Sequence, residues 1–319
     1  MIVTLTANPS LDRTVALDAA LTRGEVHRAA EVTVEPGGKG INVARVAHYA
    51  GHPARAILPA DPADPILRGL DELRLPYRTV PLPQSVRTNL TLSEPDGTTT
   101  KINEPGPTLS AGVVEALARL LVLESERADW VVLSGSLPPG VPSAWYADLV
   151  RALRPWGCRI AVDTSDQPLL SLAAHFPDSA PDLIKPNSDE LAQLTGADAA
   201  TLEAAAQAGD ASASVTAAQS LVARGVGAVL VTLGAAGAVL ATAEGAWRAV
   251  PPRITVRSTV GAGDSSVAGY VLAETRGLPA PERLRLAVAY GSAAAALAGT
   301  QLPRPDQIDI AQVEVFALV

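Results

Sequence analysis

From Ser110 to Gly237 the sequence alternates short apolar runs with helical stretches, and this rhythm constrains the fold more than any other feature. The apolar runs lie at Trp130–Leu133, Arg159–Val162, Asp182–Lys185 and Ala228–Leu233. The helical stretches include Val113–Glu126, Ala144–Leu153 and the Ala-rich Ala199–Arg224, with a loop expected around Gly209–Thr216. Strands and helices that alternate at this spacing form a parallel sheet covered on both faces. We therefore expect an α/β protein.

Polar motifs follow the ends of the expected strands. They are Ser134–Gly140, Asp163, Lys185–Glu190 and Gly234–Gly237. In parallel sheets, ligands bind beyond the carboxyl ends of the strands. The sequence thus predicts one binding cleft along that edge.

The stretch Ser258–Ser265 combines an anion site with an acid. It follows a β-like run, Ile254–Val256, and opens a helix that we expect over Ser265–Thr275. Two glycines flank Ala262, so little side chain covers the backbone N–H groups that begin the helix, and such groups attract anions. Asp264 would repel a phosphate there unless it removes a proton, which points to phosphoryl transfer. By itself, however, the stretch is explained better by a glycine turn with Asp264 as a helix cap.

Composition excludes several classes of protein. The net charge of −8 gives the protein no overall positive electrostatic field that would attract nucleic acid or an anionic membrane. Cys158 is the only cysteine among 319 residues, which excludes an internal disulfide and a cysteine-based metal cluster. We find neither a signal peptide nor an apolar run long enough to span a bilayer, and expect a cytoplasmic protein.

Thr14–Leu17 and Val26–Val34 carry polar residues at alternate positions, which predicts a small antiparallel sheet with one wet face. Tyr77–Leu82, Val86–Ser93 and Thr98–Asn103 form another set of short alternating strands. Between the two sets, Glu35–Gly40 supplies a glycine loop with a cation, Lys39, before a helix at Ile41–Ala47. The loop is not a Walker A motif, and the chain has no GxGxxG fingerprint.

Taken in order, four motifs resemble the ribokinase-like sugar kinases of the phosphofructokinase B type. They are Gly37–Asn42, Ser134–Gly140, Lys185–Asn187 and Ser258–Ser265. Thr6–Asp12, Arg87–Asn89 and Thr100–Glu104 resemble the 1-phosphofructokinase branch more narrowly. The resemblance runs from Met1 to about Leu302. It implies one three-layer α/β/α domain over residues 1–319, with a β-sheet lid whose strands lie within about 12–35 and 77–104.

The resemblance also implies roles for individual residues. Asp264 matches the catalytic base, and the backbone of Gly261, Ala262 and Gly263 matches the anion hole. Contacts to the sugar phosphate fall on Asp12, Gly38, Lys39, Asn42, Arg87 and Ser136. The residues that match the nucleotide-binding side of the site are Lys185, Asn187, Thr232, Gly234 and Gly237. Asn187 and Glu190 match a motif that acts on Mg²⁺ through water.

The implied activity is transfer of a phosphoryl group from ATP, with Mg²⁺, to the C6 hydroxyl of D-fructose 1-phosphate. Tagatose 6-phosphate or fructose 6-phosphate is the alternative acceptor. A sugar-phosphate sensor without catalysis is the alternative class, although a sensor needs no base such as Asp264. In relatives the lid frequently forms a dimer contact, so a homodimer through the lid is also expected.

Overall fold

The computed structural model describes residues 1–318 and contains a ten-stranded central sheet. The strand order is β14-β13-β12-β11-β10-β9-β8-β1-β4-β5. Strands β11 through β5 in this order pair in parallel, whereas β12, β13 and β14 extend one side in antiparallel fashion. Their bounds are β1 Ile2–Leu5, β4 Ala54–Ala60, β5 Tyr77–Pro81, β8 Trp130–Ser134, β9 Arg159–Asp163, β10 Leu183–Ile184, β11 Ala228–Thr232, β12 Ala238–Thr242, β13 Gly245–Val250 and β14 Glu314–Ala317.

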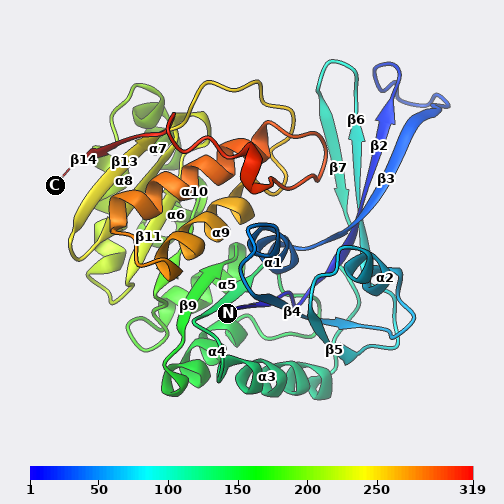
Figure 1. Ribbon diagram of the computed structural model, residues 1–319, viewed down its shortest axis with the longest axis horizontal. Helices are drawn as coiled ribbons and strands as arrows, with labels where there is room; N and C mark the ends of the chain where they lie inside the picture. Colours follow the sequence, from blue (N-terminus) through cyan, green and yellow to red (C-terminus); the bar gives the residue numbers. More distant parts are fainter. Residues whose placement is uncertain (319) are drawn as a thin grey trace.

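Helices cover both faces of this sheet, which confirms the expected three layers (Figure 1). One layer contains α1 Lys39–Tyr49, α2 Pro65–Glu72, α9 Ala262–Thr275 and α10 Ala280–Ala295. The other contains α3 Ala111–Ser125, α4 Trp145–Leu153, α5 Asp166–Ala174, α6 Ser188–Thr195, α7 Ala199–Gln207 and α8 Ser212–Val222.

Strand β8 shows why these runs are almost wholly apolar. Trp130 and Val132 pack in the core beneath α1 and α9, while Val131 and Leu133 pack in the core beneath α3 and α4. A strand buried on both faces has no position for a solvated side chain before its end. The first polar residue of β8 is therefore Ser134, at the carboxyl edge.

A second sheet has the order β3-β2-β6-β7 and projects from the body of the molecule (Figure 1). Its strands are β2 Ser10–Leu17, β3 Ala29–Gly37, β6 Arg87–Ser93 and β7 Thr99–Asn103. We call these strands the small sheet. The antiparallel pairing expected of Thr14–Leu17 and Val26–Val34 is confirmed by β2 and β3, whereas β2 and β6 pair in parallel.

Three other sequence-based expectations differ from the structure. Tyr77–Pro81 joins the central sheet as β5, since Val80 packs in the core and the strand pairs with β4. Ile254–Val256 is not a strand and is exposed. Instead of one helix and a loop, the region from Ala199 forms α7 and α8, which are separated at Gly209 with φ of 86°.

No helix among residues 1–318 is both long and apolar enough to cross a membrane.

Candidate active site

The carboxyl ends of four neighbouring strands place Thr6, Ser134, Asp163 and Lys185 in one row across the central sheet. Ser134 pairs with Asp163, and the pairings of Leu5 with Leu133 and of Ile184 with Val162 put Thr6 and Lys185 at the two ends of the row. The residues two positions earlier in β8, β9 and β10 pack in the core beneath α9, so the row faces α1 and α9.

Helix α1 begins directly over this row. The backbone N–H of Ile41 donates to Thr6 Oγ1 at 2.9 Å, which fixes the first turn. Lys39 Nζ then lies 2.9 Å from Asp163 Oδ1, and Asn42 Nδ2 donates to Asp264 Oδ2 at 2.8 Å. The glycine loop thus delivers one cation and one amide into the site.

Helix α9 begins beside α1 with an uncapped N-terminus. Gly261 has φ of 75°, a left-handed conformation that favours glycine, and no side chain caps the helix. The N–H groups of Ala262, Gly263 and Asp264 therefore have no intrahelical acceptor. A Cβ on Gly263 would stand 3.3 Å from Lys185 Nζ, so a cation lies next to these donors. Bare N–H groups beside an ammonium suit a phosphate.

Asp264 is buried, and its environment makes it a base near neutral pH. Desolvation and the charge of Asp163 raise the pKa of its carboxyl to about 6, against the opposing effects of Lys39, Lys185 and the Asn42 hydrogen bond. A carboxylate with such a pKa is well matched to accepting a proton from a hydroxyl.

Lys39, Asp163 and Lys185 form a group of ion pairs in which Asp163 and Lys185 are buried and Lys39 is partly exposed. Burial alone would lower the pKa of Lys39, but Asp163, Asp264 and Glu190 together raise it above its usual value. Burial would raise the pKa of Asp163, but Lys185 and Lys39 hold it below the usual range. The sequence placed Asp163 at the predicted cleft, as an acid directly after an apolar strand, but gave it no individual role.

On the small sheet, Asp12 and Arg87 lie on the face turned toward the body. Asp12 Oδ1 accepts hydrogen bonds from Ser10 Oγ at 2.7 Å and Asn89 Nδ2 at 3.0 Å. The carboxylate lies where a Cβ on Gly37 would be, 2.2 Å from Oδ2, so only glycine fits there.

Arg87 remains available to an anion. Its Nη1 donates to Glu104 O at 3.0 Å, whereas its buried Nε has no partner among residues 1–318. Burial lowers the pKa of Arg87, and the nearby charges of Asp12 and Glu104 oppose this effect.

Gly38 and Ser136 complete the predicted sugar-phosphate set. Gly38 is the N-cap of α1. Ser136 Oγ accepts from Asn8 Nδ2 at 3.3 Å, and the same amide donates to Pro105 O at 3.0 Å. Asn8 therefore connects the loop after β1 to the segments that follow β7 and β8. It was not singled out as a site residue from the sequence.

The residues predicted for the nucleotide gather at the ends of β10 and β11. Asn187 and Thr232 form a parallel bridge, and Thr232 N donates to Pro186 O at 3.0 Å. Leu233 N donates to Gly237 O at 2.8 Å, which closes the turn that contains Gly234.

Asn187 and Glu190 form a capping box at the start of α6. Asn187 Oδ1 accepts from Glu190 N at 2.8 Å, and Glu190 Oε2 accepts from Asn187 N at 2.9 Å. Asn187 Oδ1 is thus occupied, and within residues 1–318 no three acidic, His or Cys side chains form a metal cluster. Mg²⁺ retains several waters and needs only one or two carboxylates. The set therefore fits a magnesium ion contacted through water.

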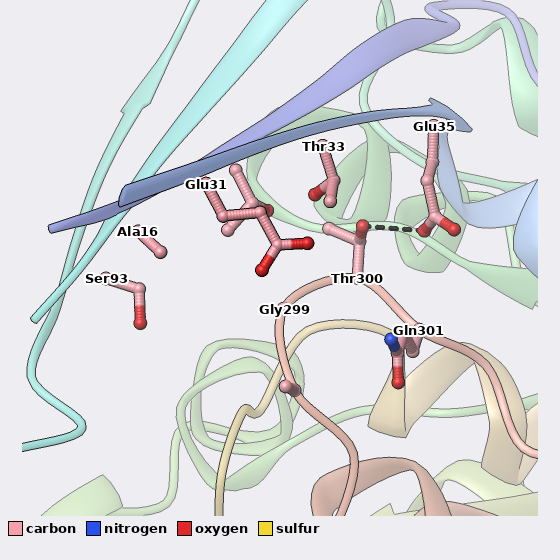
Figure 2. Close-up of a pocket in the computed structure, with 10 residues that line it drawn as sticks. Ala16, Glu31, Thr33, Glu35, Ser93, Gly299, Thr300 and Gln301 are labelled. Carbon is pink, nitrogen blue, oxygen red and sulfur yellow. Dashed lines mark hydrogen bonds between the residues drawn. The ribbon is translucent and has the colours of Figure 1, made fainter. Parts of the chain in front are cut away.

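A cavity between the small sheet and residues 298–301 lies apart from these predicted residues. Figure 2 shows Glu31, Thr33 and Glu35 of β3 facing this turn, with Thr300 Oγ1 donating to Glu35 Oε2 at 2.8 Å. None of the sequence-predicted site residues lines it. This contact fixes the base of the small sheet against the segment that follows α10.

The chain matches the family model for "pfkB family carbohydrate kinase" over residues 5–307. It is 37% identical to 1-phosphofructokinase of Rhodobacter capsulatus, covering 96% of this chain and 94% of that protein. It is 35% identical to ATP-dependent 6-phosphofructokinase isozyme 2 of Escherichia coli, covering 94% of each. Among solved structures, phosphofructokinase-2 from E. coli in complex with substrates and products superposes with a TM-score of 0.85 at 34% identity over 96% of each chain.

The raised pKa of Asp264 predicts a pH-dependent stability. Between about pH 4 and pH 6 the folded chain holds a proton that the unfolded chain has released, so this contribution is present below about pH 4 and lost as pH rises through about 6. We expect Asp264→Asn to gain about 2 kcal/mol in free energy of unfolding, relative to the parent, between pH 4 and pH 7. Urea unfolding at both pH values measures the gain, with exposed Asp18→Asn as control. Parallel curves for the parent and Asp264→Asn would contradict it.

Proposed function

The chain belongs to the pfkB family of carbohydrate kinases, and we propose that it transfers a phosphoryl group from ATP to C6 of D-fructose 1-phosphate, giving fructose 1,6-bisphosphate. The observation that carries the proposal is the buried carboxylate of Asp264 at the uncapped start of α9, beside two lysines. Several relatives named 1-phosphofructokinase, at 33–38% identity, support this acceptor.

Asp264 is the proposed base. It accepts the proton of the C6 hydroxyl as the oxygen attacks the phosphorus. Asn42 donates a hydrogen bond to Asp264 Oδ2 and so holds the carboxylate in place. The N–H groups of Gly261, Ala262 and Gly263 stabilise the charge on the transferred phosphoryl group. Positioning and electrostatic stabilisation account for most of the catalysis in such reactions.

The phosphate already present on the sugar binds at the other end of the cleft. Arg87 offers a partly buried guanidinium for it, and forked donors suit phosphate oxygens. Asp12, Asn42 and Ser136 bind ring hydroxyls, while the loop at Gly38 and Lys39 lies over the sugar. The small sheet acts as the lid of one kinase domain over residues 1–319.

ATP occupies the ends of β10 and β11 in this proposal. Lys185 contacts the phosphates, and Asn187, Thr232, Gly234 and Gly237 form the remaining surface. Asn187 and Glu190 hold Mg²⁺ through water, and the ion neutralises phosphate charge when bound. Because the proposed substrates are metabolites, we place the enzyme in the cytoplasm.

The outer face of the small sheet supports a homodimer. Pairing places Val32, Val34 and Ile102 on the face opposite to Glu31 and Thr33, and these three side chains are 43–55% exposed. An apolar exposed sheet face suits a second copy of the chain.

We expect kcat/KM for fructose 1-phosphate to exceed that for fructose 6-phosphate or tagatose 6-phosphate at least about tenfold, a difference of roughly 1.4 kcal/mol. A buried polar group left without its hydroxyl partner by the wrong sugar is the physical reason. ADP release with each acceptor measures it. Preference for fructose 6-phosphate would favour the activity named for the E. coli relative, and preference for tagatose 6-phosphate would favour a tagatose-6-phosphate kinase. Absence of ADP with every acceptor would favour a sensor.

Asp264→Asn is expected to lower kcat by roughly 10²- to 10⁴-fold with both substrates still bound, since the amide cannot take a proton. Single-turnover kinetics and calorimetric titration of each substrate separate the two effects. A variant within a few-fold of the parent would remove Asp264 from the mechanism.

Arg87→Ala should raise KM for fructose 1-phosphate by about tenfold or more and leave KM for ATP nearly unchanged, because one charge-assisted contact is lost. Arg78→Ala, which removes an arginine of β5 that is ion-paired to Glu124 of α3, is the matched control. If the two variants have the same KM for fructose 1-phosphate, Arg87 is an ordinary surface charge.

A further inference from the structure

We propose that Asp163 is a positioning residue for phosphoryl transfer, which holds Lys39 and Lys185 together at the N-terminus of α9. The inference rests on the proposed kinase activity. It assigns Asp163 a task through the two lysines, with no contact of its own to either substrate.

One carboxylate oxygen joins the two sides of the site. Lys39 Nζ lies 2.9 Å and Lys185 Nζ 3.4 Å from the same atom, Asp163 Oδ1. Lys39 belongs to the glycine loop on the sugar side, whereas Lys185 follows β10 on the nucleotide side. A phosphoryl group that moves between the substrates has to pass between these two sides, where the lysines meet.

The bonding of Asp163 differs from that of a buried aspartate with a purely structural task. Both oxygens of Asp64 accept backbone N–H groups, from Ile66 and Val86, each at 2.9 Å. Asp163 is 1% exposed, yet its Oδ2 has no partner among residues 1–318 and its Oδ1 receives only lysines. A buried charge bonded in this way costs stability, which an apolar side chain would avoid. Holding cations in place is a reason to retain it.

Repulsion explains why the lysines need an anion. Two ammonium groups so close to one atom repel each other, although Lys39, whose side chain is 37% exposed, is better solvated than Lys185 at 5%. Without the charge of Asp163 they would separate, and Lys185 would leave its place beside Gly263. Misplacement of a catalytic group by about 1 Å can lower a rate by about 100-fold.

A double-mutant cycle tests the proposal. We expect Asp163→Asn to lower kcat by about 100-fold in the parent but by less than about tenfold in a Lys39→Met background, since one of its two cations is then gone. If Asp163→Asn lowers kcat by the same factor in both backgrounds, the inference is overturned while the proposed function stays intact. Absence of ADP from the parent with every sugar phosphate would instead overturn both.

The pH profile separates the proposed role from a merely structural one. Asp264 faces Lys39 and Asn42 from α1, Asp163 from β9 and Lys185 after β10; the charge of Asp163 raises the pKa of Asp264, and the charges of the two lysines lower it. If the lysines stay in place, Asp163→Asn shifts the acid limb of kcat/KM to lower pH, whereas lysines that move away offset this shift. We expect no shift to lower pH, and a limb at lower pH would overturn the inference.

Asp182→Asn is the matched control. Asp182 Oδ2 accepts from Arg154 Nη1 at 3.0 Å and Ile160 N at 2.9 Å, before the start of β10, away from the carboxyl edge. We expect it to lower the Tm and leave the pH profile unchanged.

If Asp163→Asn yields no folded protein, Asp163→Asn with Lys39→Met removes an anion together with a cation and takes its place. Its kcat is then compared with that of Lys39→Met alone. A ratio of about two- to tenfold, from loss of the hold on Lys185, supports the inference, and a ratio near one or near 100-fold overturns it.

Discussion

The site depends on one constraint, which is that the parallel strands β1, β8, β9 and β10 end in register at the same edge of the sheet. Parallel pairing fixes neighbouring residues in register, so the polar residues at the carboxyl ends of these strands fall in one row. Helices α1 and α9 pack over that row and begin there, which brings Asn42 within 2.8 Å of Asp264 across 222 residues of chain. The cations, the base and the uncapped N–H groups all follow from this one edge.

The small sheet uses its two faces in opposite ways. Its polar face, with Asp12 and Asn89, turns toward the cleft, and its apolar face, with Val34 and Ile102, turns away from the body. Half-buried sheets usually place the apolar side on their own core. The inversion is consistent with a surface that closes over a polar ligand and meets a second copy of the chain.

Local patterns identified most elements, and failed where two sheets compete for the same kind of strand. Alternation in Tyr77–Pro81 resembles that of the small sheet, but only parallel pairing with β4 decides that it belongs to the central one. Likewise, Ile254–Val256 has β-forming residues but finds no strand partner. Periodicity reports which side chains are buried and does not report the neighbouring strand.

The sequence by itself determined the three-layer fold, the glycine-rich starts of α1 and α9, and the chemical types of the site residues, because these depend on local periodicity and on backbone that only glycine permits. The tertiary structure decided which of those residues meet. Asp163 looked like the end of an ordinary strand, and only register and helix packing place it between two lysines. Likewise, the pKa of Asp264 follows from burial and from charges far away in sequence, which no local pattern contains.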